Sequence, residues 1–312
     1  MMPAVIGLDI GGTKWLARVE RETGRPAVTQ RRPSGRDTTP EAVLDTVAAL
    51  VEECRASHHD VAAIGIGFPG LTDGLAGVVR SSVILDGWRD VPLAGMVRAR
   101  TGVPCVIDND VKTAARAEIG LRPRGSYRTM LFVSVGTGIG GAIVIDGRVV
   151  PGAAGLAGEI GHISIDAAGP LCRCGRRGCV GPQAGGAAIA ARLGLTADEL
   201  AAAVRRGDPH AIAALVDGAG MIGRALGTAL NILNPDLVVV GGGVAEVGAV
   251  FLSALETTAR REAFAEIGAA CRFEPALAGY EAGAIGAAHL AREALARAAS
   301  ARRRRVRRAV RP

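Results

Sequence analysis

The sequence predicts an α/β protein built from two similar halves with a cleft between them. Two observations support this prediction: strands alternate with helices along the chain, and each half opens with strand hairpins that contain a glycine-rich turn. The chain has 312 residues, which is enough for two modest domains with their own hydrophobic cores. No low-complexity linker divides the halves, so we expect them to be tightly coupled.

The first half begins with strands. Apolar or alternating runs predict strands over residues 5–10, 16–20, 27–32, 62–68 and 103–107. Helical periodicity predicts helices over 40–57 and 111–119. Thr39 is a good N-cap for the first of these helices, because Pro40 follows it at the first helical position.

The second half restarts with strands and then becomes rich in helices. Its strands are predicted over 130–135, 142–145, 149–150, 237–240 and 271–275, and its helices over 184–193, 196–205, 209–232, 246–260 and 281–298. Asp146-Gly147 is a hairpin turn signal between two of these strands.

Domain boundaries follow from the two halves. We expect residues 1–120 to form a smaller domain, completed by the C-terminal helix over 285–298. Residues 121–284 then form a larger domain that contains a metal-binding loop over 162–179. Residues 299–312 are expected to be a disordered, arginine-rich tail.

The charge of the chain is concentrated at its C-terminus. Apolar residues make up 49% and charged residues 21% of the sequence, which excludes disorder for the bulk of the chain. The net charge is +7, and the tail holds seven arginines, at positions 302, 303, 304, 305, 307, 308 and 311. The body is therefore neutral and presents no basic face for nucleic acid. We interpret the tail as a solvated end; electrostatic adhesion to an anionic partner is the minor alternative.

No segment has the length and hydrophobicity of a membrane span, and the N-terminus lacks the pattern of a secretory signal. A cytoplasmic protein is therefore expected. Three of the six cysteines fall within residues 172–179. In a reducing compartment such a cluster indicates metal binding rather than a disulfide.

Three glycine-rich turns are candidates for nucleotide binding. In the first, a strand ends at Asp9 and continues into a turn, and we assign Asp9, Gly11, Gly12, Thr13 and Lys14 to the cofactor site. Glycines let backbone N–H groups approach a phosphate, and the carboxylate could hold the water shell of Mg²⁺. A plain hairpin turn is an equally weighted alternative. The second turn repeats this layout at Thr137 and Gly138, and the third, Gly241-Gly242-Gly243, suits packing against an adenosine.

Asn109 and Asp110 stand where a strand ends and a helix begins. A phosphoryl acceptor needs a positioned carboxylate to take its proton, and Asp110 is placed to do so. The alternative is an ordinary Asp/Asn helix cap, which these residues alone support equally well.

Glu159 and His162 lie just before the cysteine cluster. His162, Cys172, Cys174 and Cys179 are separated by nine, one and four residues and make a four-ligand set that suits closed, structural zinc. Such a site would bind His162 through one ring nitrogen and leave the other available. The alternative is three buried thiols and a core histidine. The remaining cysteines, Cys54, Cys105 and Cys271, are expected to be packing residues.

Taken together, these motifs resemble the ROK family of bacterial sugar kinases and sugar-responsive repressors, in the hexokinase–actin superfamily. The matching segments are GLDIGGTK, GIGFPG, IDNDV, VSVGTGIGGAIVIDGRV, AAGLAGEIGH, CRCGRRGC and NILNPDLVVVGGGV, and they span residues 7–244. The resemblance implies a duplicated actin-like fold with ATP and a sugar in the cleft. ROK repressors carry an N-terminal helix-turn-helix, and the kinase-like core starts here at Val5, so we expect no DNA-binding domain.

The resemblance also implies roles for single residues. Asp110 would be the general base on the sugar 6-hydroxyl, and Asn109, Glu159 and His162 would bind the other sugar hydroxyls. Asp9, Gly11, Gly12, Thr13, Thr137 and Gly138 would face the phosphates, and the histidine and three cysteines would hold zinc. A homodimer or higher homo-oligomer is the family default.

Three positions depart from the family pattern. Gly181 replaces a glutamate that would contact the sugar near its anomeric end, and Lys112 and Ile84 each replace an asparagine. A hydrogen bond to a charged group is worth about 1.5–3 kcal/mol, so its loss would weaken a glucose-like ligand by about 10- to 100-fold.

The sequence therefore predicts an ATP-dependent kinase of a hexose, with glucose as the default acceptor. The alternatives are a kinase of a modified sugar, such as an amino sugar, or of a C7-cyclitol from secondary metabolism, and a non-catalytic sugar sensor.

Overall fold

The computed structural model describes residues 4–11, 14–20, 26–33, 38–56, 60–82 and 84–309. The chain divides into two compact units. The first unit comprises residues 1–120, 152–156 and 281–312, and the second unit comprises residues 121–151 and 157–280. None of the helices in these ranges has the length and hydrophobicity that a membrane span requires.

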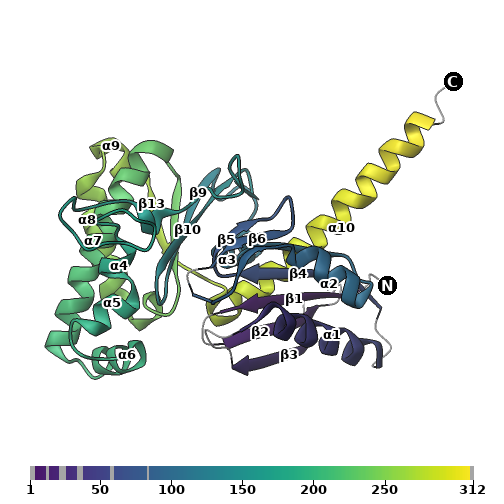
Figure 1. Ribbon diagram of the computed structural model, residues 1–312. Helices are drawn as coiled ribbons and strands as arrows, with labels where there is room; N and C mark the ends of the chain where they lie inside the picture. Colours follow the sequence, from purple (N-terminus) through teal and green to yellow (C-terminus); the bar gives the residue numbers. More distant parts are fainter. Residues whose placement is uncertain are drawn as a thin grey trace. The chain divides into compact units, whose positions relative to one another are not determined.

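The first unit contains a five-stranded sheet of order β3-β2-β1-β4-β8 (Figure 1). Strands β1, β2 and β3 form an antiparallel meander, whereas β4 and β8 continue the sheet in parallel with β1. The strands span Ala4–Ile10 (β1), Lys14–Glu20 (β2), Pro26–Pro33 (β3), Val61–Phe68 (β4) and Cys105–Asn109 (β8). Because β1, β4 and β8 are parallel, their carboxyl ends lie at one edge of the sheet.

Helices and a small second sheet complete the first unit. The helices span Pro40–Ala56 (α1), Leu93–Thr101 (α2), Asp110–Leu121 (α3) and Ala282–Ala309 (α10), and the small sheet contains Leu71–Asp73 (β5), Val78–Ser81 (β6) and Arg89–Val91 (β7). The Thr39 hydroxyl accepts a hydrogen bond from the Ala42 N–H at 3.2 Å, which confirms the N-cap that the sequence predicted for α1.

Helix α10, the last of the chain, packs closely on the sheet formed by the first strands. A Cβ atom at Gly7 would lie 2.1 Å from the Ala284 carbonyl oxygen, and one at Gly65 would lie 1.9 Å from the Ala287 carbonyl oxygen. Only glycine therefore permits this approach at β1 and β4. Arg18 of β2 also pairs with Glu281, the residue just before α10.

The second unit contains a five-stranded sheet of order β11-β10-β9-β12-β13, which has the same pattern as the first: an antiparallel meander followed by two parallel strands. Its strands span Thr129–Val135 (β9), Ile139–Ile145 (β10), Arg148–Val149 (β11), Leu237–Gly241 (β12) and Arg272–Pro275 (β13). Asp146 and Gly147 form the predicted hairpin turn with φ angles of 50° and 70°, both left-handed.

The helices of the second unit lie between its strands in the sequence and pack on its sheet (Figure 1). They span Gly181–Ala184 (α4), Gly186–Ala191 (α5), Ala197–Arg205 (α6), Pro209–Leu233 (α7), Ala249–Glu262 (α8) and Ala265–Ala270 (α9), with single 3-10 turns at Ile160–His162, Ala245–Val247 and Gly279–Glu281. One core cluster joins Leu131 and Val238 of the sheet to Leu226 of α7 and Phe251 of α8. The α/β class predicted from the sequence is confirmed.

Several elements differ from the prediction. The helix expected over 184–193 is interrupted because Gly185 is extended, with a ψ angle of 154°. Strands β5 to β7 and helices α2 and α9 were not predicted, because each is short and lacks a clear apolar period. Helix α10 continues to Ala309, beyond the end at residue 298 that the sequence predicts and into the segment expected to be disordered, of which residues 310–312 lie outside the described residues. Alanine and arginine are both strong helix formers, and no proline or glycine interrupts residues 287–309.

Candidate active site and metal centre

The carboxyl edge of the first unit's sheet holds Asp9. In the sheet, Asp9 of β1 lies beside Gly67 of β4, and Gly67 lies beside Asp108 of β8. A Cβ atom at Gly67 would lie 2.5 Å from the Thr113 hydroxyl oxygen and 3.3 Å from Asp9 Oδ1. A Cβ atom at Gly283 of α10 would lie 2.3 Å from Asp9 Oδ2. Two glycines on different elements therefore leave the space that the Asp9 carboxylate occupies.

The first glycine-rich turn joins β1 to β2, whose last ladder pair is Ile10 with Trp15. Gly11 is half-buried at the start of the turn. Gly12 and Thr13 lie outside the described residues, as does the side chain of Lys14, the first residue of β2.

Asn109 is the N-cap of α3. Its Oδ1 accepts hydrogen bonds from the N–H groups of Val111 at 2.9 Å and Lys112 at 3.3 Å, and its Nδ2 donates to the Gly70 carbonyl at 3.1 Å. These contacts fit the helix-cap alternative, because they use Oδ1 and one Nδ2–H of the Asn109 amide. A primary amide has two donors, and within the described residues only one of them is used, which leaves one Nδ2–H for a ligand.

Asp110 is the first residue of α3 and is half-buried. Its Oδ1 accepts a hydrogen bond from the Val111 N–H at 2.9 Å, and its backbone carbonyl accepts one from the Thr113 hydroxyl at 2.6 Å. The N-terminal end of a helix favours an ionised carboxylate. Asp110 follows the carboxyl end of β8, so it lies at the same sheet edge as Asp9. An ionised carboxylate at this position can accept a proton.

Two residues near this junction were not selected from the sequence. Asp108 and Arg116 form a buried ion pair with an Oδ2-to-Nη2 distance of 2.8 Å. The pair joins the end of β8 to the second turn of α3. No local sequence signal identified it, because the pairing depends on how the helix leaves the strand.

Two of the three departures from the ROK pattern also lie in the first unit. Lys112 is only 2% exposed, and its ammonium donates to the Gly155 carbonyl. This contact gives the lysine a packing role against residues 152–156. Ile84 is 36% exposed, and its N–H donates to the Ser82 hydroxyl at 3.2 Å.

The second glycine-rich turn joins β9 to β10 in the second unit. Thr137 and Gly138 are exposed at its tip. The carbonyl groups of Gly136 and Thr137 accept hydrogen bonds from the N–H groups of Gly186 at 2.8 Å and Ala187 at 3.3 Å, in the first turn of α5. The turn is thus anchored from behind while its tip stays open.

Gly241 is the last residue of strand β12, and Gly242 follows it. A Cβ atom at Gly242, where φ is +90°, would lie 2.5 Å from the Val135 carbonyl oxygen, and one at Gly241 would lie 2.8 Å from the Ala276 Cβ atom. At both positions a side chain would collide with neighbouring residues, so packing alone explains both glycines. At the following residue, Gly243, a Cβ atom would have no heavy atom of the described residues within 4 Å. Gly243 is therefore the most open glycine of the predicted turn.

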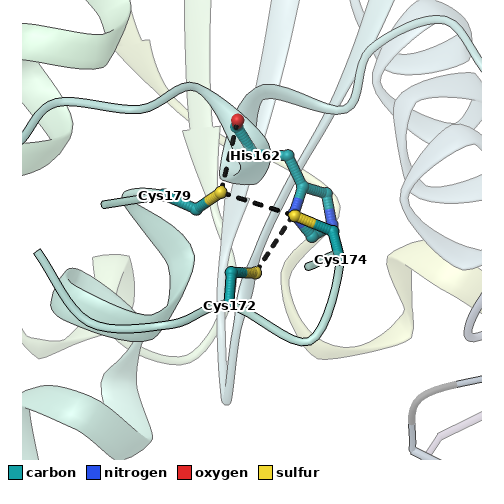
Figure 2. A group of neighbouring side chains, drawn as sticks. All are labelled: His162, Cys172, Cys174 and Cys179. Atoms are coloured by element: carbon teal, nitrogen blue, oxygen red, sulfur yellow. Dashed lines mark hydrogen bonds between the residues drawn. The ribbon is translucent and has the colours of Figure 1, made fainter. Parts of the chain in front are cut away.

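The predicted metal ligands gather in one place in the second unit (Figure 2). One nitrogen or sulfur atom from each of His162, Cys172, Cys174 and Cys179 lies within 4.8 Å of the others. Cys172 and Cys179 are buried, whereas Cys174 is exposed. Backbone bridges pair Ser164 with Cys179 and fold the loop onto itself.

The spacing of these atoms fits a tetrahedral metal. Zinc bonds of about 2.0–2.3 Å separate the ligand atoms of a tetrahedron by roughly 3.5–3.8 Å. Here Cys172 Sγ lies 3.5 Å from His162 Nδ1, and Cys174 Sγ lies 3.6 Å from Cys179 Sγ. The N–H of Arg176 lowers the pKa of the Cys174 thiol to about 7, whereas burial raises the pKa of Cys179 to about 11.

His162 has two differently placed ring nitrogens. Nδ1 faces the cysteine sulfurs, and Nε2 lies 3.9 Å from a carboxylate oxygen of Glu159. Both side chains are more than two-fifths exposed. The ring can therefore bind a metal at Nδ1 while Nε2 and the Glu159 carboxylate stay open to a ligand.

Comparison with known proteins identifies the family. The sequence matches the ROK family over residues 5–294. This chain belongs to the ROK family.

Individual ROK relatives match over most of the chain. The glucokinase of Streptomyces coelicolor is 32% identical in an alignment that covers 94% of this chain and 98% of that protein. The N-acetylmannosamine kinase of Salmonella typhi is 34% identical over 77% of this chain and 82% of that protein. The crystal structure of a ROK family glucokinase from Streptomyces griseus in complex with glucose and AMPPNP has a TM-score of 0.82 and 32% identity, and covers 93% of this chain and 99% of that one.

Proposed function

We propose that this ROK protein is an ATP-dependent kinase that transfers the γ-phosphate to the 6-hydroxyl of a hexose, with glucose as the default acceptor. The observation that carries the proposal is the half-buried Asp110 carboxylate at the start of α3, at the sheet edge that also holds Asp9. The similarity to a glucokinase crystallised with glucose and AMPPNP supports the choice of acceptor and donor.

In this proposal Asp110 takes the proton of the acceptor hydroxyl as the phosphoryl group transfers. Asn109, Glu159 and His162 bind other sugar hydroxyls through their remaining amide, carboxylate and Nε2 groups. When bound, Mg²⁺ would supply positive charge to the phosphates, and Asp9 would hold its water shell.

The glycine-rich turns face the phosphates through Gly11, Gly12, Thr13, Thr137 and Gly138. The equal strand orders of the two sheets support the wider expectation of a duplicated, hexokinase-like fold with a cleft. Closure of such a cleft would exclude water from the phosphoryl group.

The ligand set and spacing of the cysteine loop favour structural zinc. A His-Cys₃ set fills all four positions of a tetrahedral ion and leaves none for substrate. Zinc would fix the His162 ring through Nδ1 and orient Nε2 beside Glu159. The metal would thus act on the proposed sugar site only through the ring that it holds.

The test is Asp110→Asn, assayed for ATP turnover with a panel of hexoses, amino sugars and cyclitols. We expect turnover to fall by about 10²–10⁴-fold while acceptor binding is largely retained. Asp45→Asn is the matched control, because Asp45 is an exposed carboxylate of the same unit that pairs with Arg100 at 3.0 Å. Near-normal turnover in Asp110→Asn would remove Asp110 from this role. A wild-type protein without turnover on any acceptor would instead favour the sugar sensor.

A modified hexose or a cyclitol is the second candidate acceptor. The observation that favours it is Gly181, where a Cβ atom would lie 3.1 Å from the carbonyl oxygen of Gly161, between Glu159 and His162 in the chain. Position 181 therefore borders the proposed hydroxyl-binding residues and carries no group of its own there. Gly181→Glu should lower the KM for glucose by about 10-fold or more if glucose is the acceptor and lacks only this contact. An unchanged KM, with an amino sugar or cyclitol as the best acceptor of the panel, favours the second candidate.

A further inference from the structure

We infer that Arg116 is a positioning residue whose guanidinium fixes the junction between β8 and α3 and thereby sets the position of Asp110. The inference rests on the proposed role of Asp110 and adds a residue that the family resemblance does not assign. Arg116 lies on the second turn of α3, six positions after Asp110.

The first contact joins the helix to the strand that precedes it. Arg116 Nη2 lies 2.8 Å from Asp108 Oδ2, and the two side chains are only 10% and 13% exposed. The other oxygen of the same carboxylate, Oδ1, accepts the backbone N–H of Asn109 at 2.8 Å. One carboxylate thus links the guanidinium to the residue immediately before Asp110.

The second contact lies within the helix. Arg116 Nη1 donates to the carbonyl of Lys112 at 3.2 Å, in the first turn of α3. The guanidinium therefore contacts both segments that flank Asp110: the strand end through Asp108 and the first helical turn through Lys112. Rotation of that turn relative to β8 would break one of the two contacts.

Helix α10 holds the arginine from the other side. His289 Nδ1 lies 3.2 Å from the Arg116 carbonyl oxygen, and Glu293 Oε2 lies 3.6 Å from Arg116 Nε. That Nε is buried and has no hydrogen-bond partner among the residues that the structure describes. A buried donor without a hydrogen bond destabilises the folded state. Here the contacts of Nη1 with Lys112 and of Nη2 with Asp108 offset that cost.

The burial of the pair predicts what its loss does. Without Arg116 the Asp108 carboxylate, which is only 13% exposed, loses the guanidinium that lies 2.8 Å away, so we expect it to turn toward solvent. This rotation weakens its bond to the Asn109 N–H. Asp110 is the next residue, and misplacement of a catalytic group by about 1 Å can cost on the order of 10²-fold in rate.

The test compares Arg116→Gln and Arg116→Lys with Arg100→Gln, which removes an exposed ion pair from the same unit. We expect Arg116→Gln to lower kcat by about 10- to 100-fold with the KM for ATP unchanged, and Arg116→Lys to recover part of the loss because it keeps the charge. Arg100→Gln should match the wild type. Wild-type kcat in folded Arg116→Gln, or a KM for ATP that rises in parallel, overturns the inference.

A second experiment separates positioning from general destabilisation. In an Asp110→Asn background, Arg116→Gln should cause no further fall in kcat, because residues that act through one group are not additive. A further fall by the same factor as in the wild type overturns the inference. If Arg116→Gln does not fold, Arg116→Lys is measured in the Asp110→Asn background instead, and it should likewise cause no further fall in kcat. A wild-type enzyme that is inactive on every acceptor refutes the proposed function itself, which is a different outcome from full activity in the arginine variants.

Discussion

Substitution of Gly283 by alanine tests whether the α10 helix sets the position of Asp9. The added Cβ atom would lie 2.3 Å from Cγ and Oδ2 of Asp9 and 2.6 Å from its Oδ1, where ordinary contact begins at 3.4 Å. The overlap of about 1 Å must be relieved by the carboxylate or by the helix.

The carboxylate has little room to yield. The Asp9 backbone is paired with Leu16 of β2 on one side and with Gly67 of β4 on the other. A Cβ atom at Gly67 would already lie 3.3 Å from Oδ1, so the carboxylate is also close to β4. Either Asp9 rotates out of place or α10 moves away from the sheet.

Two opposing effects set the stability of Gly283→Ala. Alanine gains about 0.8–1.0 kcal/mol over glycine within a helix, whereas forcing an extra methyl group into a packed site costs about 1–3 kcal/mol. We expect a net loss of about 0–2 kcal/mol in the free energy of unfolding. Because Asp9 is displaced, we expect kcat with ATP to fall by about 10²-fold, a far larger effect than that on stability.

The assay is steady-state ATP turnover together with thermal unfolding. Gly220→Ala is the matched control, because its Cβ atom in helix α7 would meet only the Thr258 hydroxyl oxygen, at 3.7 Å. The control should gain stability by up to about 1 kcal/mol and keep wild-type kcat. If Gly283→Ala shows the same gain and the same kcat as Gly220→Ala, the reasoning about Asp9 and α10 is refuted.

Other predictions concern the metal, a strand end and a helix cap. Chelation should release about one zinc per chain and lower Tm, and Cys174→Ser should lose the metal whereas Cys271→Ser retains it; metal analysis that finds none in the folded wild type would contradict this. The N–H of Thr129, with that of Arg128, holds the pKa of the Asp236 carboxyl below its usual value, so its stabilisation is present above about pH 4 and is lost as pH falls through the folded-state pKa. Asp236→Asn should therefore lower Tm at pH 7 and match the wild type in strong acid, and an equal difference at both pH values would be inconsistent with this cause. Thr196→Ala removes the capping box of α6 and should cost about 1 kcal/mol, measured by chemical denaturation; no change in the denaturation midpoint would show that the cap contributes nothing.

Local signals predicted much of the fold. The Asp146-Gly147 turn and the Thr39 cap depend on residues that are neighbours in sequence, and both are present. The residues proposed for zinc also gather, because their chemistry and short spacing leave few arrangements. The roles of Asn109 and Asp110 stay predictions, since capping and substrate binding both fit the geometry.

Contacts between distant segments could not be predicted. Lys112 donates to Gly155, which is 43 positions away in the chain. Nothing near the lysine in the sequence indicates that partner, so the sequence alone does not show that Lys112 has a packing role. The two buried charges Asp108 and Arg116 are likewise explained only once the angle between β8 and α3 is known.

Helix α10 has a consequence for the order in which the protein is made. The strands that it covers, β1 and β4, leave the ribosome within the first 68 residues, but the helix begins only at Ala282. Until then the sheet surface at Gly7 and Gly65 stays uncovered, with apolar Val5 and Ala63 beside it. The first unit therefore reaches its native state only after residues 282 onward have been synthesised. A nascent chain that lacks them exposes this apolar surface to chaperones and proteases.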